Sequence, residues 1–257
     1  MEKKIGFIGG GRVARIILKG FKNRGIKFQN VYVLEKDKNV LEKLKNFYDD
    51  PINEENYENL SHCFIIFLAV HPPSLKECLE KLKIYLTKDQ IVVSLAPKIK
   101  TEKVQELLDG HRNVLRMIPN APSIIGNGFN PLCFSKDFES EKKDKILEIL
   151  GFLGKTFEVK EEKLEAYALI SGMGPTYFWF QLRHLKELGK IFGLDEEEAK
   201  EAICYMLEGS IKTLFYSKIE EEEVMDLIPL KPLGEFEEKI KEFYSDKLKG
   251  IYEKIKT

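Results

Sequence analysis

Three small residues near the N-terminus, Gly9, Gly11 and Ala14, have the spacing G-x-G-x-x-[G/A]. They follow an apolar run that ends at Ile8 and open a stretch of helical periodicity, as the phosphate-binding turn of a dinucleotide fold requires. Gly9 would allow the tight turn, Gly11 would let a pyrophosphate approach the backbone, and Ala14 would let the helix pack on the strand. The phosphates would face N–H groups at the helix start, where the macrodipole favours negative charge. The alternative is a glycine-rich turn that binds no ligand.

Two charged residues, Glu35 and Lys36, follow a second short strand that we predict over Asn30 to Leu34. In a dinucleotide fold this position meets the adenosine ribose. An acid there accepts a hydrogen bond from the 2′-hydroxyl of NAD, and a nearby base accommodates the 2′-phosphate of NADP. The pair is therefore compatible with either coenzyme, or it is ordinary solvated charge after a strand.

His71 follows the most apolar run in the first half of the chain, Cys63 to Val70. Continuous hydrophobicity is typical of a strand buried on both faces of a parallel sheet, and the prolines after His71 stop the strand. Ligands bind at the carboxyl ends of such strands. If protonated, His71 could donate a hydrogen bond to a substrate; otherwise it merely ends the strand.

The elements that must position these residues alternate between strands and helices as far as residue 160. Apolar runs predict further strands at Gln90 to Leu95, Asn113 to Ile118, Leu132 to Phe134 and Lys155 to Val159, and helical patterns cover Lys38 to Phe47, Pro73 to Leu86, Thr101 to Leu108 and Ser140 to Leu153. Such alternation indicates an α/β fold with a Rossmann-type, doubly wound, mostly parallel sheet over residues 1–160.

Residues 161–257 have no strand pattern and predict an all-α second domain. Its helical patterns cover Lys163 to Phe192, Asp195 to Tyr216 and Leu233 to Ile255. Gly172, Gly174 and Pro175 interrupt the first of them, and glycine and proline disfavour a helix interior by about 1 and 3 kcal/mol relative to alanine. The interruption marks a kink, a close approach of a ligand, or a plain boundary between two helices.

The net charge of −1 over 257 residues gives no general bias toward nucleic acid or an anionic membrane surface. No apolar run approaches the roughly 18 residues that a membrane span needs, and from the charged start before the first strand we expect no signal peptide. The four cysteines are far apart and the histidines lack ligand spacing, which favours free thiols in a reducing compartment and no metal site. We therefore expect a cytoplasmic protein that binds neither a membrane nor nucleic acid.

Four segments in this order resemble the motifs of one family, the pyrroline-5-carboxylate reductases. They are Gly6 to Ala14 (G-F-I-G-x-G-x-M-A in the family), Phe67 to Pro72 (F-L-A-V-K-P), Arg116 to Pro122 (R-x-M-P-N-T-P) and Ala168 to Tyr177 (A-L-S-G-S-G-P-A-Y). The resemblance extends from Ile5 to about Leu214. It implies hydride transfer from NADP or NAD, in reduced form, to the C=N carbon of a cyclic imine acid, giving proline. It also implies a homodimer, or a higher homo-oligomer, formed through the C-terminal helices.

The resemblance implies site residues position by position. The coenzyme would contact Gly9, Gly10, Gly11, Arg12 and Val13 at its pyrophosphate, Glu35, Lys36 and Asn56 at its adenosine, and Ala69, Val70, His71 and Pro72 at its nicotinamide end, with Asn120 also in the coenzyme site. The substrate would contact Ser171, Met173, Gly174, Pro175 and Lys231. Thr176, Tyr177 and His71 are the candidate catalytic donors.

Several positions depart from the family pattern. His71 replaces a lysine, Met173 a serine and Thr176 an alanine, and Pro97-Lys98 replaces an alanine-glycine pair. The family's substrate loop S-P-G-G-T-T corresponds to Lys231 to Phe236, which has lost a glycine and both threonines. Glu235 would repel a carboxylate there unless Lys231 compensates. Another imine or carbonyl substrate, or a dinucleotide-binding protein without catalysis, therefore remain alternatives.

Overall fold

The computed structural model describes residues 3–54 and 56–256, which form two compact units. The first comprises residues 3–173 together with 252–256, and the second comprises Gly174–Ile251. The sequence pattern of strands ends near residue 160, but the contacts between residues place the boundary between the units after Met173. Residues 161–173 pack on the first unit because Leu164 and Glu165 are buried there.

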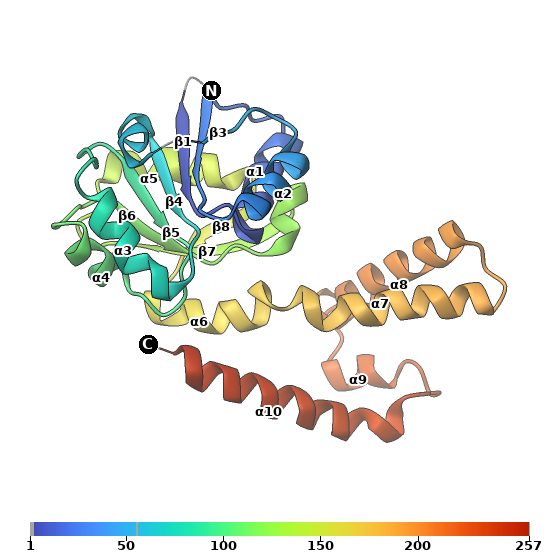
Figure 1. The fold of residues 1–257 in the computed structure, drawn as a ribbon. Helices are drawn as coiled ribbons and strands as arrows, with labels where there is room; N and C mark the ends of the chain where they lie inside the picture. Colours follow the sequence, from blue (N-terminus) through green and yellow to red (C-terminus); the bar gives the residue numbers. More distant parts are fainter. Residues whose placement is uncertain (1–2, 55, 257) are drawn as a thin grey trace. The chain divides into compact units, whose positions relative to one another are not determined.

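A single sheet forms the centre of the first unit (Figure 1). Within the described residues it has the order β3-β2-β1-β4-β5-β6-β7-β8. The strands are β1 (Lys4–Ile8), β2 (Asn30–Leu34), β3 (Asn53–Glu54), β4 (Ile65–Leu68), β5 (Ile91–Ser94), β6 (Val114–Met117), β7 (Gly128–Phe134) and β8 (Gly154–Glu158). All neighbours are parallel except β6 and β7. The predicted doubly wound, mostly parallel sheet is confirmed, and its order reverses direction between β1 and β4.

The central strands bury both faces, as their continuous hydrophobicity predicts. In β4, Ile65 and Phe67 belong to one apolar cluster and Ile66 and Leu68 to the other. The first cluster includes side chains of α1 (Arg12–Asn23), α2 (Lys38–Tyr48) and α5 (Ser140–Gly151). The second includes side chains of α3 (Pro72–Leu82) and α4 (Thr101–Leu107). Helices therefore cover both faces of the sheet and leave its carboxyl edge for the loops.

Two strands depart from the sequence prediction. β3 is a two-residue strand with no apolar run, so periodicity gave no signal for it. β7 begins at Gly128, earlier than the predicted Leu132, and runs antiparallel to β6. The connection between these strands is the short helix η2 (Ala121–Ile125), which is too short for the crossover that a parallel pair needs.

All regular secondary structure in the described residues of the second unit is helical, as predicted. It contains α7 (Pro175–Ile191), α8 (Glu196–Tyr216), α9 (Glu221–Asp226), the short helix η5 (Gly234–Phe236) and most of α10 (Glu237–Ile255). Asp195 caps α8 in a capping box with Glu198, which explains why the helix begins there. The aromatic rings of Tyr177 and Tyr244 pack edge to face, with centroids 5.7 Å apart.

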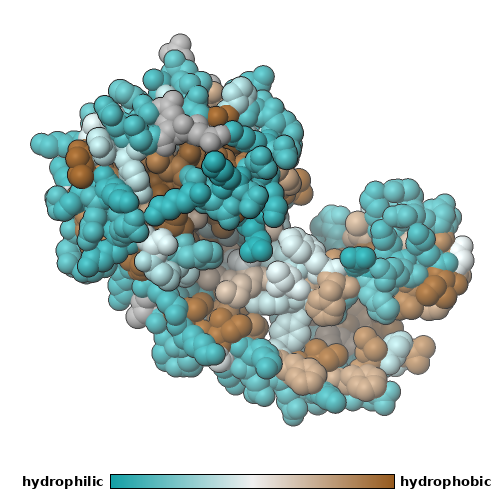
Figure 2. Space-filling model, in the orientation of Figure 1, coloured by the Kyte–Doolittle hydropathy of each residue, from teal (hydrophilic) through white to brown (hydrophobic). Residues whose placement is uncertain are grey.

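Large hydrophobic and aromatic side chains remain on the surface of this unit, which includes brown and tan areas in Figure 2. They include Phe178, Trp179 and Phe180 on α7 and Phe215 and Tyr216 on α8, each more than half exposed. Contiguous apolar surface on a folded protein usually marks an interaction site. None of the helices in residues 3–54 and 56–256 has the length and hydrophobicity to cross a membrane.

Candidate active site

The glycine turn after β1 lies directly against the end of β4. Gly9 has φ of +100°, and a Cβ there would come within 2.6 Å of the Ala69 carbonyl oxygen, so only glycine is compatible with this position. A Cβ on Gly11, in contrast, would meet nothing within 4 Å. The backbone therefore forms a tight turn at Gly9 and has open space beside Gly11, as the approach of a diphosphate requires.

The start of α1 is built for an anion. Gly11 is its N-cap residue, no side chain of the described residues caps it, and its first turn carries no acidic residue. Arg12 is exposed at this end, Val13 is half-buried, and Ala14 is fully buried against the sheet. Uncapped N–H groups and the helix dipole together stabilise a bound phosphate.

Glu35 and Lys36 have different surroundings at the end of β2. The Glu35 carboxylate accepts hydrogen bonds from the backbone N–H groups of Gly10, at 2.8 Å, and Asp37, at 2.9 Å. The Lys36 ammonium group instead pairs with Glu77 on α3, at 3.2 Å. Glu35 is therefore hydrogen-bonded to the glycine turn, whereas Lys36 forms its ion pair with α3.

The exposed side chain of Asn56, at the start of the short helix η1 (Tyr57–His62), acts as its cap. Its Oδ1 accepts from the N–H of Asn59 at 3.4 Å. The sequence-predicted contact of Asn56 with adenosine stays a prediction.

The residues after β4 complete one wall of the site. The Ala69 N–H donates to the carbonyl of Ile8 at 2.8 Å, which continues the pairing of β1 and β4 beyond the strands. Ala69 and Val70 are half-buried, His71 is exposed, and Pro72 begins α3. The chain thereby brings the predicted pyrophosphate turn and the predicted nicotinamide segment together at the carboxyl edge of the sheet.

The side chain of Asn120 is engaged within the protein. Its Oδ1 accepts from the N–H of Phe129 at 3.0 Å, and its Nδ2 donates to the carbonyl of Ser171 at 3.3 Å. The Ser171 hydroxyl in turn donates to the Tyr167 carbonyl at 2.8 Å, within the π-helical turn η4 (Ala168–Gly172) that follows α6 (Leu164–Tyr167). Asn120 therefore holds the interrupted helix in place, and the interruption is a π turn, a feature frequent at functional sites.

The remaining predicted residues lie at or beyond the division between the units. Met173 ends the first unit and is exposed. In the second unit, Gly174 and Pro175 begin α7, Thr176 is exposed, and burial raises the pKa of Tyr177 above its ordinary value of 10.0. The exposed Lys231 precedes η5.

The sequence patterns did not identify one cluster of buried charged side chains. Arg116 on β6 is fully buried and donates through Nη2 to Glu165 on α6, which is 2% exposed. Its Nη1 lies 3.5 Å from Glu161, whose carboxylate also accepts from the N–H and hydroxyl of Thr101 at 2.8 and 3.1 Å. A signal was present, because an arginine inside a continuous apolar strand must find a buried counter-charge.

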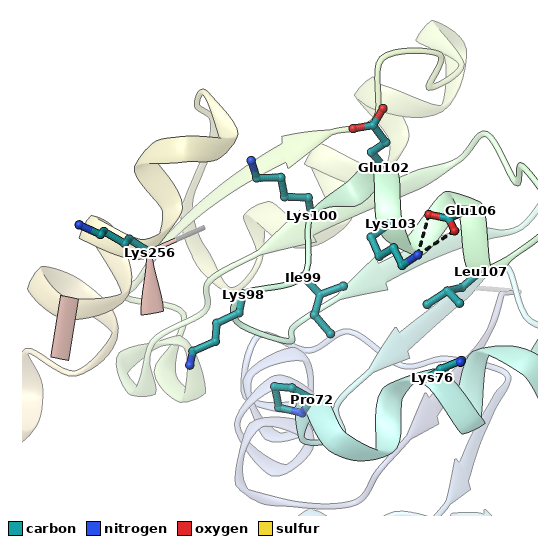
Figure 3. Close-up of a pocket in the computed structure, with 10 residues that line it drawn as sticks. All are labelled: Pro72, Lys76, Lys98, Ile99, Lys100, Glu102, Lys103, Glu106, Leu107 and Lys256. Carbon is teal, nitrogen blue, oxygen red and sulfur yellow. Dashed lines mark hydrogen bonds and ion pairs between the residues drawn. The ribbon is translucent and has the colours of Figure 1, made fainter. Parts of the chain in front are cut away.

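A basic pocket of about 760 Å³ lies near Pro72 at the same edge (Figure 3). Its lysines are Lys76, Lys98, Lys100, Lys103 and Lys256, and Lys103 is paired with Glu106 at 2.7 Å. Lys98 has φ of +69°, the left-handed conformation that glycine adopts most easily, at the position where the family pattern has glycine. Among the described residues, no group of histidine, cysteine or acidic side chains could hold a metal ion.

Comparison with known proteins places this geometry among nicotinamide-dependent reductases. The family profile described as NADP oxidoreductase coenzyme F420-dependent matches residues 4–98. Pyrroline-5-carboxylate reductase 2 of Bacillus subtilis is 30% identical over 220 residues, which cover 84% of this chain and 78% of that protein. The corresponding enzyme of Haemophilus influenzae is 26% identical over 212 residues, covering 82% and 78%.

Solved structures show the same similarity over nearly the whole chain. The crystal structure of Plasmodium falciparum pyrroline carboxylate reductase with NADP bound has a TM-score of 0.80 and 25% identity, covering 98% of this chain and 96% of that one. The pyrroline-5-carboxylate reductase of Coxiella burnetii has a TM-score of 0.68 and 26% identity, covering 99% and 95%.

Proposed function

Since this chain belongs to the pyrroline-5-carboxylate reductase family, we propose that it reduces the C=N bond of a cyclic imine acid with NADPH or NADH, in proline biosynthesis. The chain is an NAD(P)-dependent oxidoreductase that acts on a CH–NH group. The observation that carries this proposal is the uncapped start of α1, with open space beside Gly11, set against the end of β4.

The bound coenzyme supplies the hydride, so the residues of the chain must bind and orient the reactants. N–H groups of the turn from Gly9 to Val13 would hold the diphosphate, while the segment from Ala69 to Pro72 would flank the nicotinamide. Asn120 supports this arrangement by holding Ser171 through a hydrogen bond. We assign Ser171, Met173, Gly174, Pro175 and Lys231 to the substrate.

The reduction places a hydride on carbon and a proton on nitrogen, so the imine needs a proton donor. His71, at the carboxyl end of β4, and Thr176 and Tyr177, at the start of α7, are the candidates within the matching motifs. Alanine variants of His71 and Thr176 and a Tyr177→Phe variant test them one at a time. A donor should lower kcat by about 100-fold or more with little change in coenzyme affinity. Unchanged kcat excludes the residue.

A homodimer or higher oligomer formed through the C-terminal helices is supported by the apolar surface of the second unit. Phe178 is 52% exposed on α7, and Phe215 is 62% exposed on α8. Sedimentation equilibrium tests this assignment, with a Phe215→Glu variant as the disrupted form. A monomeric wild-type chain would contradict it.

We place the enzyme in the cytoplasm, since its four cysteines are free thiols and three of them are buried.

The direct test of activity is oxidation of NADPH and of NADH by purified protein with pyrroline-5-carboxylate, followed by the loss of reduced-nicotinamide absorbance. Turnover that depends on the imine supports the proposal. The divergent segment Lys231 to Phe236 favours a second candidate, a different imine or carbonyl substrate, because Glu235 adds negative charge to it. Tight coenzyme binding without turnover would favour that candidate and direct the search to other cyclic imines.

A further inference from the structure

The Glu35 carboxylate has a fixed position at the end of β2. Each of its oxygens accepts a backbone hydrogen bond, from Gly10 at 2.8 Å and from Asp37 at 2.9 Å. Its aliphatic stem packs on the glycine turn, because a Cβ built on Gly10 would lie 3.4 Å from the Glu35 Cβ. Glu35 is half-buried, and the carboxylate therefore lies on the turn and does not move freely in solvent.

This position faces the adenosine ribose in a dinucleotide fold. β2 lies beside β1, and the glycine turn follows β1, so the end of β2 borders the coenzyme crevice. A carboxylate has about four lone-pair sites, and the two backbone bonds use two of them. Glu35 can therefore still accept hydrogen bonds from the hydroxyls of a ribose.

The charges around Glu35 do not favour a phosphate. Lys36 pairs with Glu77 on α3 at 3.2 Å, and Asp37 places a second carboxylate at the start of α2. Lys38, the first residue of α2, and Arg12, at the start of α1, are exposed. Arg12 lies at the end of the helix that would hold the diphosphate, which both coenzymes share. A 2′-phosphate would thus meet the fixed negative charge of Glu35, and no cation in residues 3–54 and 56–256 pairs with that carboxylate.

We propose that Glu35 selects NAD(H) over NADP(H) in this chain, although a relative of similar fold has been crystallised with NADP bound. This inference rests on the proposed coenzyme site but not on the identity of the imine. The ribose 2′-hydroxyl donates to Glu35, whereas a 2′-phosphate is repelled by it.

Isothermal titration calorimetry of the full chain with NAD⁺ and with NADP⁺ tests the proposal without any substrate. We expect NAD⁺ to bind about 100-fold more tightly, which corresponds to about 2.8 kcal/mol and is within the range that like-charge repulsion gives. Glu35→Gln and Glu35→Ser should each reduce this preference by about tenfold or more, chiefly through tighter NADP⁺ binding. Two substitutions are used because glutamine cannot accept from both backbone N–H groups, and thermal unfolding verifies that each variant folds.

Asp37→Asn is the matched control. It removes a neighbouring negative charge but keeps the oxygen that caps α2, where Asp37 accepts from Asn39 at 2.8 Å. Because Asp37 caps α2 and does not lie on the glycine turn, the preference should change much less than in the Glu35 variants. Arg12→Ala should weaken both nucleotides alike. Equal or tighter NADP⁺ binding by the wild type would overturn the proposal while leaving the coenzyme site intact. The proposal would also be overturned if the Glu35 and Asp37 variants changed the coenzyme preference equally. The same holds if Arg12→Ala lost affinity for NADP⁺ alone. Failure to bind either nucleotide would refute the proposed function together with this inference.

Discussion

Replacing Glu165 by alanine should destabilise the first unit strongly, because it leaves a buried guanidinium without its main counter-charge. Arg116 is 0% exposed and Glu165 is 2% exposed. Glu161 is the remaining carboxylate, 3.5 Å from Nη1 and also bonded to Thr101. Breaking a buried pair by removing one partner costs about 3–5 kcal/mol, and the partial compensation by Glu161 favours the lower end, about 3 kcal/mol.

A double substitution separates the effect of the buried charges from the effect of the lost side-chain volume. A double variant, Arg116→Met with Glu165→Met, removes both charges and keeps apolar volume, so its stability should lie within about 1–2 kcal/mol of the wild type. Glu165→Gln keeps an acceptor oxygen beside the guanidinium but loses the charge, and should fall between the two, at about 1–3 kcal/mol.

Urea unfolding followed by circular dichroism measures these differences in the free energy of unfolding. The single tryptophan, Trp179, lies on α7 in the second unit, so its fluorescence reports separately on that unit. Lys83→Met is the matched control. Lys83 pairs at 3.1 Å with Asp109, and their side chains are 35% and 71% exposed, so its loss should cost no more than about 1 kcal/mol. If Glu165→Ala costs no more than this control, or if the double variant is as unstable as Glu165→Ala, the buried charge does not determine the effect.

Three further predictions concern the turn, the thiols and pH. Gly9→Ala should weaken coenzyme binding by about tenfold or more, because Gly9 has φ of +100° and a Cβ there would lie 2.6 Å from the Ala69 carbonyl oxygen. Calorimetry with NAD⁺ measures the affinity, and an unchanged affinity would contradict the prediction. Burial raises the pKa of the Cys133 thiol to about 12, whereas Cys204 is exposed, so iodoacetamide at mild alkaline pH should modify Cys204 first. Peptide mass spectrometry measures the order of modification. The reverse order would mean that the sheet around Cys133 opens readily. Burial lowers the pKa of His111 below its ordinary 6.5, so the folded state binds fewer protons than the unfolded state and stability should fall as pH drops below about 6.5. Urea unfolding across this range should show a shallower pH dependence for His111→Gln, and an identical slope would exclude His111 as the cause.

Local patterns were sufficient for most of the first unit. Apolar runs identified β4, β5 and β6, because strands buried on both faces need apolar side chains at nearly every position. The glycine spacing identified the turn after β1, because its backbone conformation admits no side chain at Gly9. β3 escaped detection, since two residues that pair at an edge need no apolar pattern.

The sequence by itself determined most of the order of strands and helices, the glycine turn and the family motifs, because each depends on neighbouring residues. Only the tertiary structure decided which distant groups meet. Arg116 pairs with Glu165, and Asn120 donates a hydrogen bond to the carbonyl of Ser171. The Glu35 carboxylate accepts from the N–H of Gly10, whereas Lys36 forms an ion pair with Glu77. Such pairings depend on the packing of elements far apart in the chain. Periodicity reports whether a side chain is buried, but it carries no information about the group that the side chain meets there.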